Sequence, residues 1–243
     1  MSDAGQQGAE PTGLEPAGLE EWTDAVADDG GPLPVRHRTE RFEGHVWSVV
    51  SDDVDFGTSI ARRDVILHPG AVAVIALDDT DRVLLIPQYR HPVGRWLFEP
   101  PAGLLDAADE QPWRTAGREL AEEAGYRASR WDVLVDLYLS PGGTSEAIRV
   151  YLARGLEPLP DGRPHTGEAE EAHLPRAWVD LDQARDLALQ GHIGSPSAVT
   201  GILAAWASRE GGWASLRPVD CEWAARDGLL RTDRVRLPRR NGA

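Results

Sequence analysis

One predicted helix concentrates the side chains best suited to chemistry. A proline at its start and Gly125 after its end predict a helix over Pro112–Ala124. At about 100° per residue, Glu119, Glu122 and Glu123 fall within one arc of roughly 100°. Like charges at this spacing destabilise a helix by about 0.2–0.5 kcal/mol per pair, and negative charge near its C-terminus opposes the macrodipole. A hard divalent cation, Mg²⁺ or Mn²⁺, would remove both penalties; a solvated helix face is the alternative.

The composition excludes several classes of function. All 25 basic residues are arginines, which excludes Schiff-base catalysis and a P-loop lysine. The formal net charge of −15 disfavours nucleic acid as a partner. The single cysteine, Cys221, excludes an internal disulfide framework and fits a reducing compartment, so we expect a cytoplasmic protein. We expect no membrane span, because no apolar run approaches about 18 residues, and no signal peptide.

The rest of the chain alternates short apolar runs with helical patterns. Residues 1–35 are acidic and rich in Gly, Pro and Ala, which favours a disordered tail. Strands are expected at Val46–Val50, Ile60–Leu67, Ala71–Leu77, Val83–Ile86, Val133–Tyr138, Ile148–Leu152 and Ala177–Val179. Two more helices are expected, one capped by Asp180 and stopping at Gly191, the other capped by Ser195 and ending near Trp206. Strands interleaved with helices predict a mixed α/β sandwich.

The glutamate-rich helix is part of a longer pattern. Gly103 is followed after six residues by Glu110, and after seven more by Arg118-Glu119-Leu120-x-Glu122-Glu123-x-Gly125-Tyr126. This pattern resembles the Nudix box, the loop–helix–loop signature of the Nudix hydrolases. The commonest form of the box has five residues between the glycine and the first glutamate, so this chain carries one extra. Asp109 also stands where many relatives have glycine.

Segments around the box resemble the ADP-ribose pyrophosphatase branch of that family. They are Arg63-Asp64-Val65, Gln88-Tyr89-Arg90, Glu99-Pro100-Pro101-Ala102-Gly103 and Ser140-Pro141-Gly142-Gly143-Thr144-Ser145-Glu146. The resemblance implies a Nudix α/β/α sandwich with a mixed sheet, preceded by a small N-terminal antiparallel β-sheet. It divides the chain into the tail (1–35), an N-terminal β region for dimerisation (36–68), the Nudix domain (69–212) and a basic C-terminal extension (213–243).

The resemblance also implies an activity. It is Mg²⁺-dependent hydrolysis of the pyrophosphate bond of ADP-ribose, to AMP and ribose 5-phosphate, or of a related nucleoside diphosphate derivative; Mn²⁺ is an alternative ion. Arg118 is implied to orient a ligating glutamate, although a plain surface pair with Glu122 remains open. The implied metal ligands are Glu119, Glu122, Glu123 and the main-chain carbonyl of Ala102.

Other residues are candidates for binding the substrate. Arg63 and Arg90 suit bidentate contact with phosphate oxygens. Glu146 can accept hydrogen bonds from ribose hydroxyls, and Glu99 is a further polar candidate. Trp47 is a candidate for stacking on adenine, with a role in the core as the alternative.

The general base is expected in a polar loop at 165–173, because branch members supply it from a glutamate-rich loop at this point. Glu171 is the first candidate and Glu170 the second, and an ordinary solvated loop is the alternative. The resemblance implies a homodimer with shared active sites, in which Arg63 acts across the interface. Two other functions stay open: a Nudix hydrolase for nucleotide sugars, dinucleoside polyphosphates or oxidised nucleotides, and a non-catalytic ADP-ribose sensor.

Overall fold

The computed structural model of the chain describes residues 26–28, 31–106, 110–164 and 175–236. Every helix and strand named below belongs to one compact unit, Pro32–Ala243. No described helix is both long enough and apolar enough to cross a membrane.

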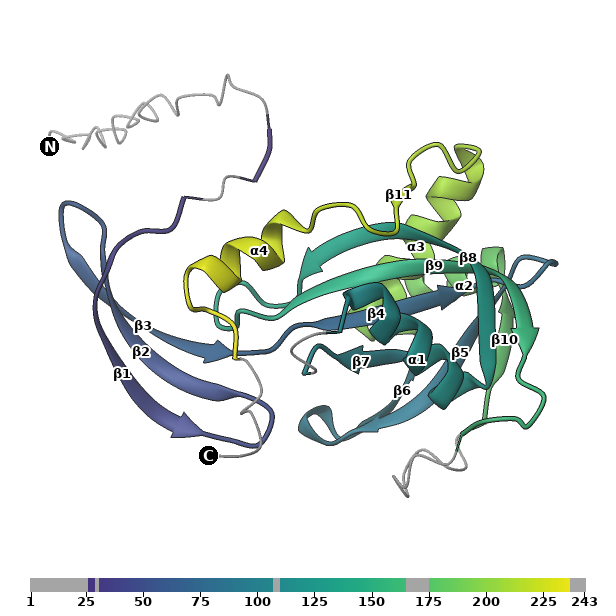
Figure 1. Cartoon of the computed structure of the whole chain (residues 1–243), viewed down its shortest axis with the longest axis horizontal. Helices are drawn as coiled ribbons and strands as arrows, with labels where there is room; N and C mark the ends of the chain where they lie inside the picture. The colour runs from purple at the N-terminus through teal and green to yellow at the C-terminus, as the bar shows by residue number, and fades with distance from the viewer. Residues whose placement is uncertain (1–25, 29–30, 107–109, 165–174, 237–243) are drawn as a thin grey trace, which may run out of the picture. The chain divides into compact units, whose positions relative to one another are not determined.

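Three antiparallel strands open this unit: β1 (Val35–Glu43), β2 (Ser48–Asp55) and β3 (Ile60–Leu67), in the order β1-β2-β3 (Figure 1). β3 has the expected bounds, but β2 starts later than expected and continues to Asp55. Ion pairs hold its polar half in the sheet, Arg38 to Asp52 at 2.7 Å and Arg62 to Asp53 at 2.8 Å. Charge pairing between strands thus extends β2 beyond its apolar run.

Two further sheets follow. The larger is mixed, in the order β11-β8-β9-β4-β7, with β4 and β9 parallel and the other neighbours antiparallel. Its strands are β4 (Ala71–Ala76), β7 (Ala102–Leu104), β8 (Tyr126–Tyr138), β9 (Ala147–Pro158) and β11 (Arg217–Pro218). The smaller sheet, in the order β10-β5-β6, contains β5 (Arg82–Arg90), β6 (Arg95–Glu99) and β10 (Ala177–Asp180), with the 3₁₀ turn η1 (His91–Val93) between β5 and β6.

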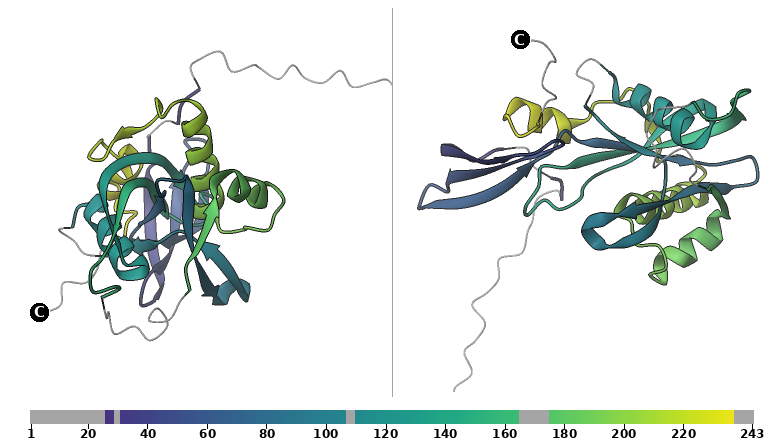
Figure 2. Two further views of the ribbon diagram at one scale, coloured as in Figure 1. Left: turned by 90° about the vertical axis from the view of Figure 1, so that its right-hand side faces the viewer. Right: turned by 90° about the horizontal axis from the view of Figure 1, so that it is seen from below.

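Helices cover both faces of these sheets. Along β4, Ala71, Ala73 and Ile75 pack with residues of α2 (Leu181–Leu189) and α3 (Pro196–Glu210). Their alternate neighbours, including Val72 and Val74, pack instead with α1 (Pro112–Ala124). The right-hand view of Figure 2 shows α1 on one side of the strands and α2 with α3 on the other. Because β4 is apolar at every position, it can be buried on both faces, and the expected α/β/α sandwich is confirmed.

The two helix caps expected from the sequence have different outcomes. The Asp180 side chain accepts hydrogen bonds from the main-chain N–H groups of Asp182 and Gln183 at 3.0 and 3.1 Å, so this cap is confirmed. Ser195 occupies the N-cap position of α3, but its side chain makes no capping bond. Its Oγ lies instead 3.2 Å from the Oγ of Ser197.

The C-terminal extension packs onto this core through a buried tryptophan. Trp223 is 5% exposed, and the guanidinium carbons of Arg149 and Arg226 lie 4.8 and 5.9 Å from the centroid of its ring. The buried Arg149 also donates to the carbonyl oxygens of Cys221 and Glu222 at 2.8 and 2.9 Å. Helix α4 (Ala224–Arg231), which the sequence patterns did not predict, follows this anchor.

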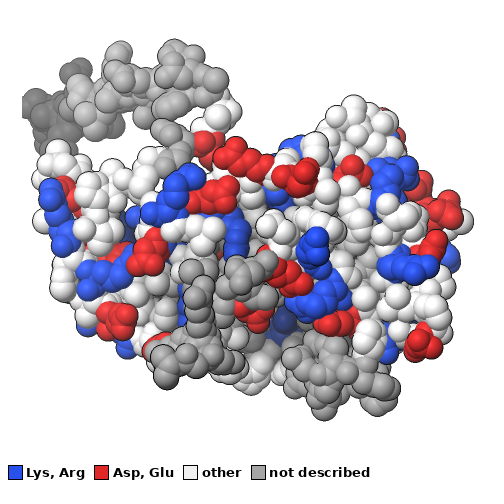
Figure 3. Space-filling view, in the orientation of Figure 1, with Lys and Arg blue, Asp and Glu red and all other residues white. Residues whose placement is uncertain are grey.

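Charge is distributed rather than segregated on the face shown in Figure 3. Acidic and basic side chains are interspersed there, in keeping with the many ion pairs of the structure. The acidic excess of the chain therefore does not form one continuous acidic patch on this face.

Candidate active site

Glu123 is the most buried carboxylate of helix α1, with 4% of its surface exposed. Its Oε1 accepts a hydrogen bond from Gln88 Nε2 on β5 at 3.0 Å, and its Oε2 accepts one from the main-chain N–H of Ala102 on β7 at 2.9 Å. These two donors compensate the carboxylate for lost hydration. Glu123 therefore joins the helix to two strands instead of lying on a solvated helix face.

Arg118 binds the other carboxylates near this helix. Its Nη1 lies 2.8 Å from Glu119 Oε1 and 2.9 Å from Glu122 Oε2, and its Nη2 lies 3.4 Å from Glu110 Oε2. Burial lowers the pKa of Arg118, but attraction to these carboxylates outweighs burial, so the pKa is raised. The pair with Glu122 that the sequence left open is present, together with a contact to Glu119. One guanidinium among three carboxylates leaves the group negatively charged.

Gly103 on β7 makes room for Glu119. A Cβ atom at position 103 would collide with the Cγ, Cδ and Oε1 atoms of Glu119. The strand can approach the helix this closely because residue 103 has no side chain. The helix and the strand thus meet in one close-packed group, which we call the α1–β7 junction: Ala102, Gly103, Arg118, Glu119, Glu122 and Glu123.

The donor chemistry of the α1–β7 junction suits a hard divalent cation. Carboxylate and main-chain oxygens are the ligands that Mg²⁺ and Mn²⁺ prefer. In the described part of the chain, however, no three Asp, Glu, His or Cys side chains are gathered closely enough to hold a metal ion. The reason is visible in the contacts, since Arg118 binds Glu119 and Glu122 while Gln88 and Ala102 bind Glu123. A cation at this junction would compete with the guanidinium of Arg118.

Arg90 and Glu99 form a bidentate ion pair between β5 and β6. Arg90 Nε lies 3.0 Å from Glu99 Oε1, and Nη2 lies 2.6 Å from Oε2. Hydrogen bonding to Glu99 raises the pKa of Arg90; burial opposes this, and the charges of Glu123 and Glu146 reinforce it. The Arg90 side chain is 46% exposed, so a phosphate can still reach it.

Glu146 directly precedes β9 and lies beside the buried His68. Burial raises the pKa of Glu146, and the positive charge of Arg90 partly offsets this rise. Glu146 Oε1 is 3.7 Å from His68 Nε2. Burial lowers the pKa of His68 to about 4, so its ring is neutral near pH 7. The negative charges of Glu146 and Glu123 both raise the pKa of Arg90, so the two carboxylates act on the same arginine.

A pocket of about 420 Å³ adjoins Ser145, the residue before Glu146. Its walls come from β3, from the loop between β8 and β9, and from the C-terminal extension; they include Arg63, Pro141, Gly142, Gly143, Leu229 and Arg234. The guanidinium of Arg63 lies 5.5 Å from the centroid of the Phe56 ring. A Cβ atom at either glycine would meet no other atom within 4 Å, so this wall is bare backbone that a ligand can approach.

The remaining candidates lie apart from this group or outside the described residues. Trp47 follows β1 in the N-terminal sheet, is 41% exposed, and has its ring 6.2 Å from that of Phe42. The two candidates for the general base, Glu170 and Glu171, lie outside the described residues.

Two polar residues of this region were missed in the sequence. Gln88 belongs to a segment that supported the family resemblance, but its contact with Glu123 spans 35 residues of sequence. His68 stands alone at the end of an apolar strand, where a satisfied core histidine is an equally good interpretation. The contacts of Gln88 and His68 join residues far apart in the sequence, so the spacing of neighbouring residues does not predict them.

The sequence pattern of the NUDIX domain family matches residues 67–199, which is more than half of the chain and includes the whole α1–β7 junction. The chain belongs to the Nudix family. The resemblance of the glutamate-rich helix to a Nudix box is thereby confirmed, together with its place in a Nudix hydrolase fold. Nudix hydrolases generally use divalent metal ions, in keeping with the oxygen donors gathered at this junction.

Individual relatives agree with this assignment. The chain is 45% identical over 184 residues to an ADP-ribose pyrophosphatase of Mycobacterium tuberculosis, a match that covers 75% of this chain and 87% of that protein. It is 40% identical over 149 residues to a methanol dehydrogenase activator of Bacillus methanolicus, covering 60% and 78% of the two chains. The fold is similar to that of a crystal structure of an ADP compounds hydrolase, with a TM-score of 0.63 and 22% identity over 76% of this chain and 98% of that chain.

Proposed function

We propose that this Nudix protein hydrolyses the pyrophosphate bond of ADP-ribose, giving AMP and ribose 5-phosphate. The observation that carries the proposal is the α1–β7 junction: buried Glu123 binds the N–H of Ala102, Glu119 fills the space beside Gly103, and Arg118 contacts both Glu119 and Glu122. The similarity to the Mycobacterium tuberculosis ADP-ribose pyrophosphatase supports this choice of substrate. Related nucleoside diphosphate derivatives, including nucleotide sugars, are the second candidates.

The residues proposed to hold Mg²⁺, or alternatively Mn²⁺, are Glu119, Glu122, Glu123 and the main-chain carbonyl of Ala102. A divalent ion held by these residues would supply positive charge to neutralise the diphosphate and would lower the pKa of a bound water. Gln88 and the Ala102 N–H fix the position of the Glu123 carboxylate. Arg118 orients Glu119 and Glu122 through its two short contacts. The protein thus supplies the oxygen donors and holds them through other residues, and a cation bound there would displace Arg118 from Glu119 and Glu122.

The residues proposed to bind the substrate lie on several other elements of the fold. Arg90, held by Glu99, is proposed to bind a phosphate oxygen, and Glu146 is proposed to accept from a ribose hydroxyl. Arg63 borders the pocket next to Glu146 and is proposed to bind the distal part of the substrate. Trp47 stays a proposal for adenine stacking, and Glu171 or Glu170 for the general base that takes a proton from the attacking water.

We propose that the protein acts as a homodimer built through residues 36–68, within the division 1–35, 36–68, 69–212 and 213–243. The N-terminal sheet exposes Phe42, Phe56 and Ile60 at 56%, 45% and 61%. The hairpin of β5 and β6 exposes Val93 and Trp96 at 60% and 65%. Exposed apolar groups on two elements favour a partner surface, because they lose contact with water on association. Light scattering during size exclusion tests this by measuring mass: we expect a dimer for the wild type and a monomer for Ile60→Asp, and a monomeric wild type would contradict the proposal.

A product assay tests the proposed activity. The full chain is incubated with ADP-ribose, a nucleotide sugar and a dinucleoside polyphosphate, each with Mg²⁺, with Mn²⁺ and with chelator. We expect AMP and ribose 5-phosphate from ADP-ribose, and no product with chelator. If only the nucleotide sugar is hydrolysed, the protein is a Nudix hydrolase with a different substrate. If ADP-ribose binds tightly but is not hydrolysed, a non-catalytic sensor is favoured. A cytoplasmic site of action, suggested by the single cysteine, is tested by fractionation of producing cells.

A further inference from the structure

The C-terminal extension contacts the three-residue connection between β3 and β4, His68-Pro69-Gly70. Val235 forms a parallel β-bridge with His68, and the main-chain N–H of Arg236 donates to the His68 carbonyl oxygen at 3.4 Å. From α4, Arg226 Nη1 donates to the Pro69 carbonyl oxygen at 2.6 Å. Val235 is 8% exposed, so this contact is part of the packed interior.

The other side of His68 faces the loop that carries Glu146. The main-chain N–H of His68 donates to Ser145 Oγ at 3.0 Å. In the side chain, Nδ1 accepts from the main-chain N–H of Gly70 at 3.1 Å, which assigns the proton of the neutral ring to Nε2. Nε2 is the atom that lies 3.7 Å from Glu146 Oε1. A movement of less than about 1 Å would bring this N–H within hydrogen-bonding distance of the carboxylate.

Packing alone gives no reason for a histidine at this position. The ring is almost fully buried, and burying an imidazole costs desolvation that an apolar side chain of similar size avoids. One nitrogen of the ring is fixed by Gly70, and the other is directed at Glu146. The side chain therefore has one fixed end and one end aimed at a residue of the candidate site.

We propose that His68 is a positioning residue for Glu146, and that the C-terminal segment Thr232–Arg236 holds His68 in place. This inference rests on the proposed function, because it takes Glu146 as a substrate-binding residue. After the shift of less than about 1 Å described above, Nε2 of His68 donates to Glu146 and directs the carboxylate toward the ligand. The C-terminal extension is thus part of the construction of the site, although no residue of Thr232–Arg236 belongs to the α1–β7 junction.

Four variants test the link between His68 and Glu146: His68→Leu, His68→Gln, Glu146→Gln and the double variant His68→Leu/Glu146→Gln. Glutamine retains a donor, whereas leucine fills the space without one. We expect His68→Leu to raise KM about tenfold, the loss typical of a hydrogen bond to a charged group, with kcat within about twofold. His68→Gln should recover most of the loss, and the double variant should have the KM of Glu146→Gln alone.

Binding is also measured without turnover, as the Kd of ADP-ribose by calorimetry in the absence of metal. This separates the two proposals: a wild type that binds but does not hydrolyse ADP-ribose overturns the proposed activity, while coupling of the two variants in Kd still supports the role of His68. An active wild type whose His68→Leu variant keeps the wild-type KM and Kd overturns the inference. Equal losses in His68→Leu and His68→Gln, additive with Glu146→Gln, also overturn it.

Two truncations test the role of the C-terminal segment. A chain that ends at Arg231 lacks Thr232–Arg236, and the matched control ends at Arg236. We expect the shorter chain to show the KM of His68→Leu and the control to keep the wild-type KM. If the shorter chain fails to fold by circular dichroism, Arg236→Pro replaces it, because proline at 236 lacks the main-chain N–H that donates to the His68 carbonyl oxygen. A wild-type KM in a folded chain lacking this pairing would overturn the role of the segment.

Discussion

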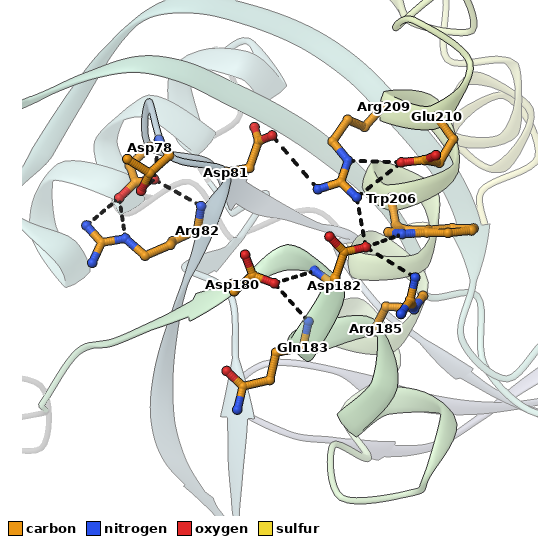
Figure 4. Close-up of polar contacts among 11 residues, drawn as sticks. Asp78, Asp81, Arg82, Asp180, Asp182, Gln183, Arg185, Trp206, Arg209 and Glu210 are labelled. Carbon is orange, nitrogen blue, oxygen red and sulfur yellow. Dashed lines mark hydrogen bonds and ion pairs between the residues drawn. The ribbon is translucent and has the colours of Figure 1, made fainter.

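Two acidic regions of this protein have similar composition but different surroundings. At the corner between α2 and α3, Asp182 accepts from Arg209 Nη2 at 2.9 Å and from Trp206 Nε1 at 2.8 Å, and Arg185 lies 3.2 Å away (Figure 4). At the α1–β7 junction, Arg118 contacts three carboxylates. Each region carries more carboxylates than arginines among its described contacts. Charge count alone therefore does not separate them.

Exposure to water separates them. The side chains of Asp182 and Glu210 at the corner are 49% and 56% exposed, whereas those of Glu119 and Glu122 are 13% and 26% exposed. Water screens the excess charge at the corner, and hydrogen bonds from Arg209 and Trp206 hold the pKa of Asp182 below its usual value. At the junction, the carboxylates of Glu119 and Glu122 are less exposed to water than those of the corner. Lower exposure therefore makes the carboxylates of the junction, and not those of the corner, the candidates for binding a cation.

Removing one carboxylate charge from each region is expected to give the largest difference in turnover between them. Glu123→Gln keeps the shape of the side chain but places an amide nitrogen against either Gln88 Nε2 or the Ala102 N–H, both of which are donors. It also removes one of the proposed metal ligands. We expect Mg²⁺-dependent turnover of ADP-ribose to fall at least about 100-fold. The control, Asp182→Asn at the corner, should keep wild-type turnover. Unchanged turnover in Glu123→Gln, or loss of its native circular dichroism, would count against the catalytic role of the junction.

A second difference in activity is expected when one carbon atom is added in each region, by changing a glycine to alanine. Gly103→Ala introduces a Cβ into the space of the Glu119 carboxylate, so Glu119 must leave its position. We expect activity to fall about 10- to 100-fold, as for displaced metal ligands. Gly194, between α2 and α3, has no positive φ, and a Cβ added there would meet no other atom within 4 Å, so Gly194→Ala is the matched control. Equal activities in the two variants would show that Glu119 can move without consequence.

A smaller difference in kcat/KM is expected when an arginine of each region is changed to lysine. Arg118→Lys keeps the charge but cannot span Glu119, Glu122 and Glu110 with one planar group. We expect kcat/KM to fall about tenfold, and the Mg²⁺ concentration for half activity to change, because the ligands lose their orientation. Arg209→Lys at the corner should leave both values unchanged. Steady-state kinetics over a magnesium titration give both readings.

The smallest effect is expected at the corner, in acid. The folded-state pKa of Asp182 is lowered, so its ion pairs stabilise the protein above the ordinary pKa of 3.8 and cease to do so as pH falls through the folded-state value. Asp182→Asn should therefore lower Tm slightly near pH 7, and the difference from wild type should shrink below about pH 4. Scanning calorimetry from about pH 3 to about pH 7 would measure it. A Tm difference that grows in acid would contradict this sign.

The sequence predicts the elements whose signals are local. Helix α1 has the expected bounds because a proline and Gly125 mark its ends, and β3 has the expected bounds because its apolar residues do. The family pattern predicts which carboxylates gather on α1. Asp180 is predicted as a cap because its donors lie two and three residues away.

The sequence does not predict what depends on distant partners. β2 extends through Asp52 because Arg38 of another strand pairs with it. The packing of the C-terminal extension depends on Arg149, a charged residue inside an apolar strand, whose partners at Cys221 and Glu222 lie 72 and 73 residues away. An arginine in such a run is a signal that can be noticed, but its partner cannot be read from spacing. The contact between His68 and Glu146 likewise joins residues far apart in the sequence and cannot be predicted from their spacing.

The contact between Gly103 and Glu119 means that the residue at one of these positions limits which residue the other can hold. While Glu119 fills that space, a side chain at 103 would have to displace it, even though the glycine performs no chemistry itself. A smaller residue at 119 would leave room for a side chain at 103. If hydrolysis needs Glu119, as proposed, a bulky residue at the position that corresponds to 103 would mark a related protein without this activity before any assay.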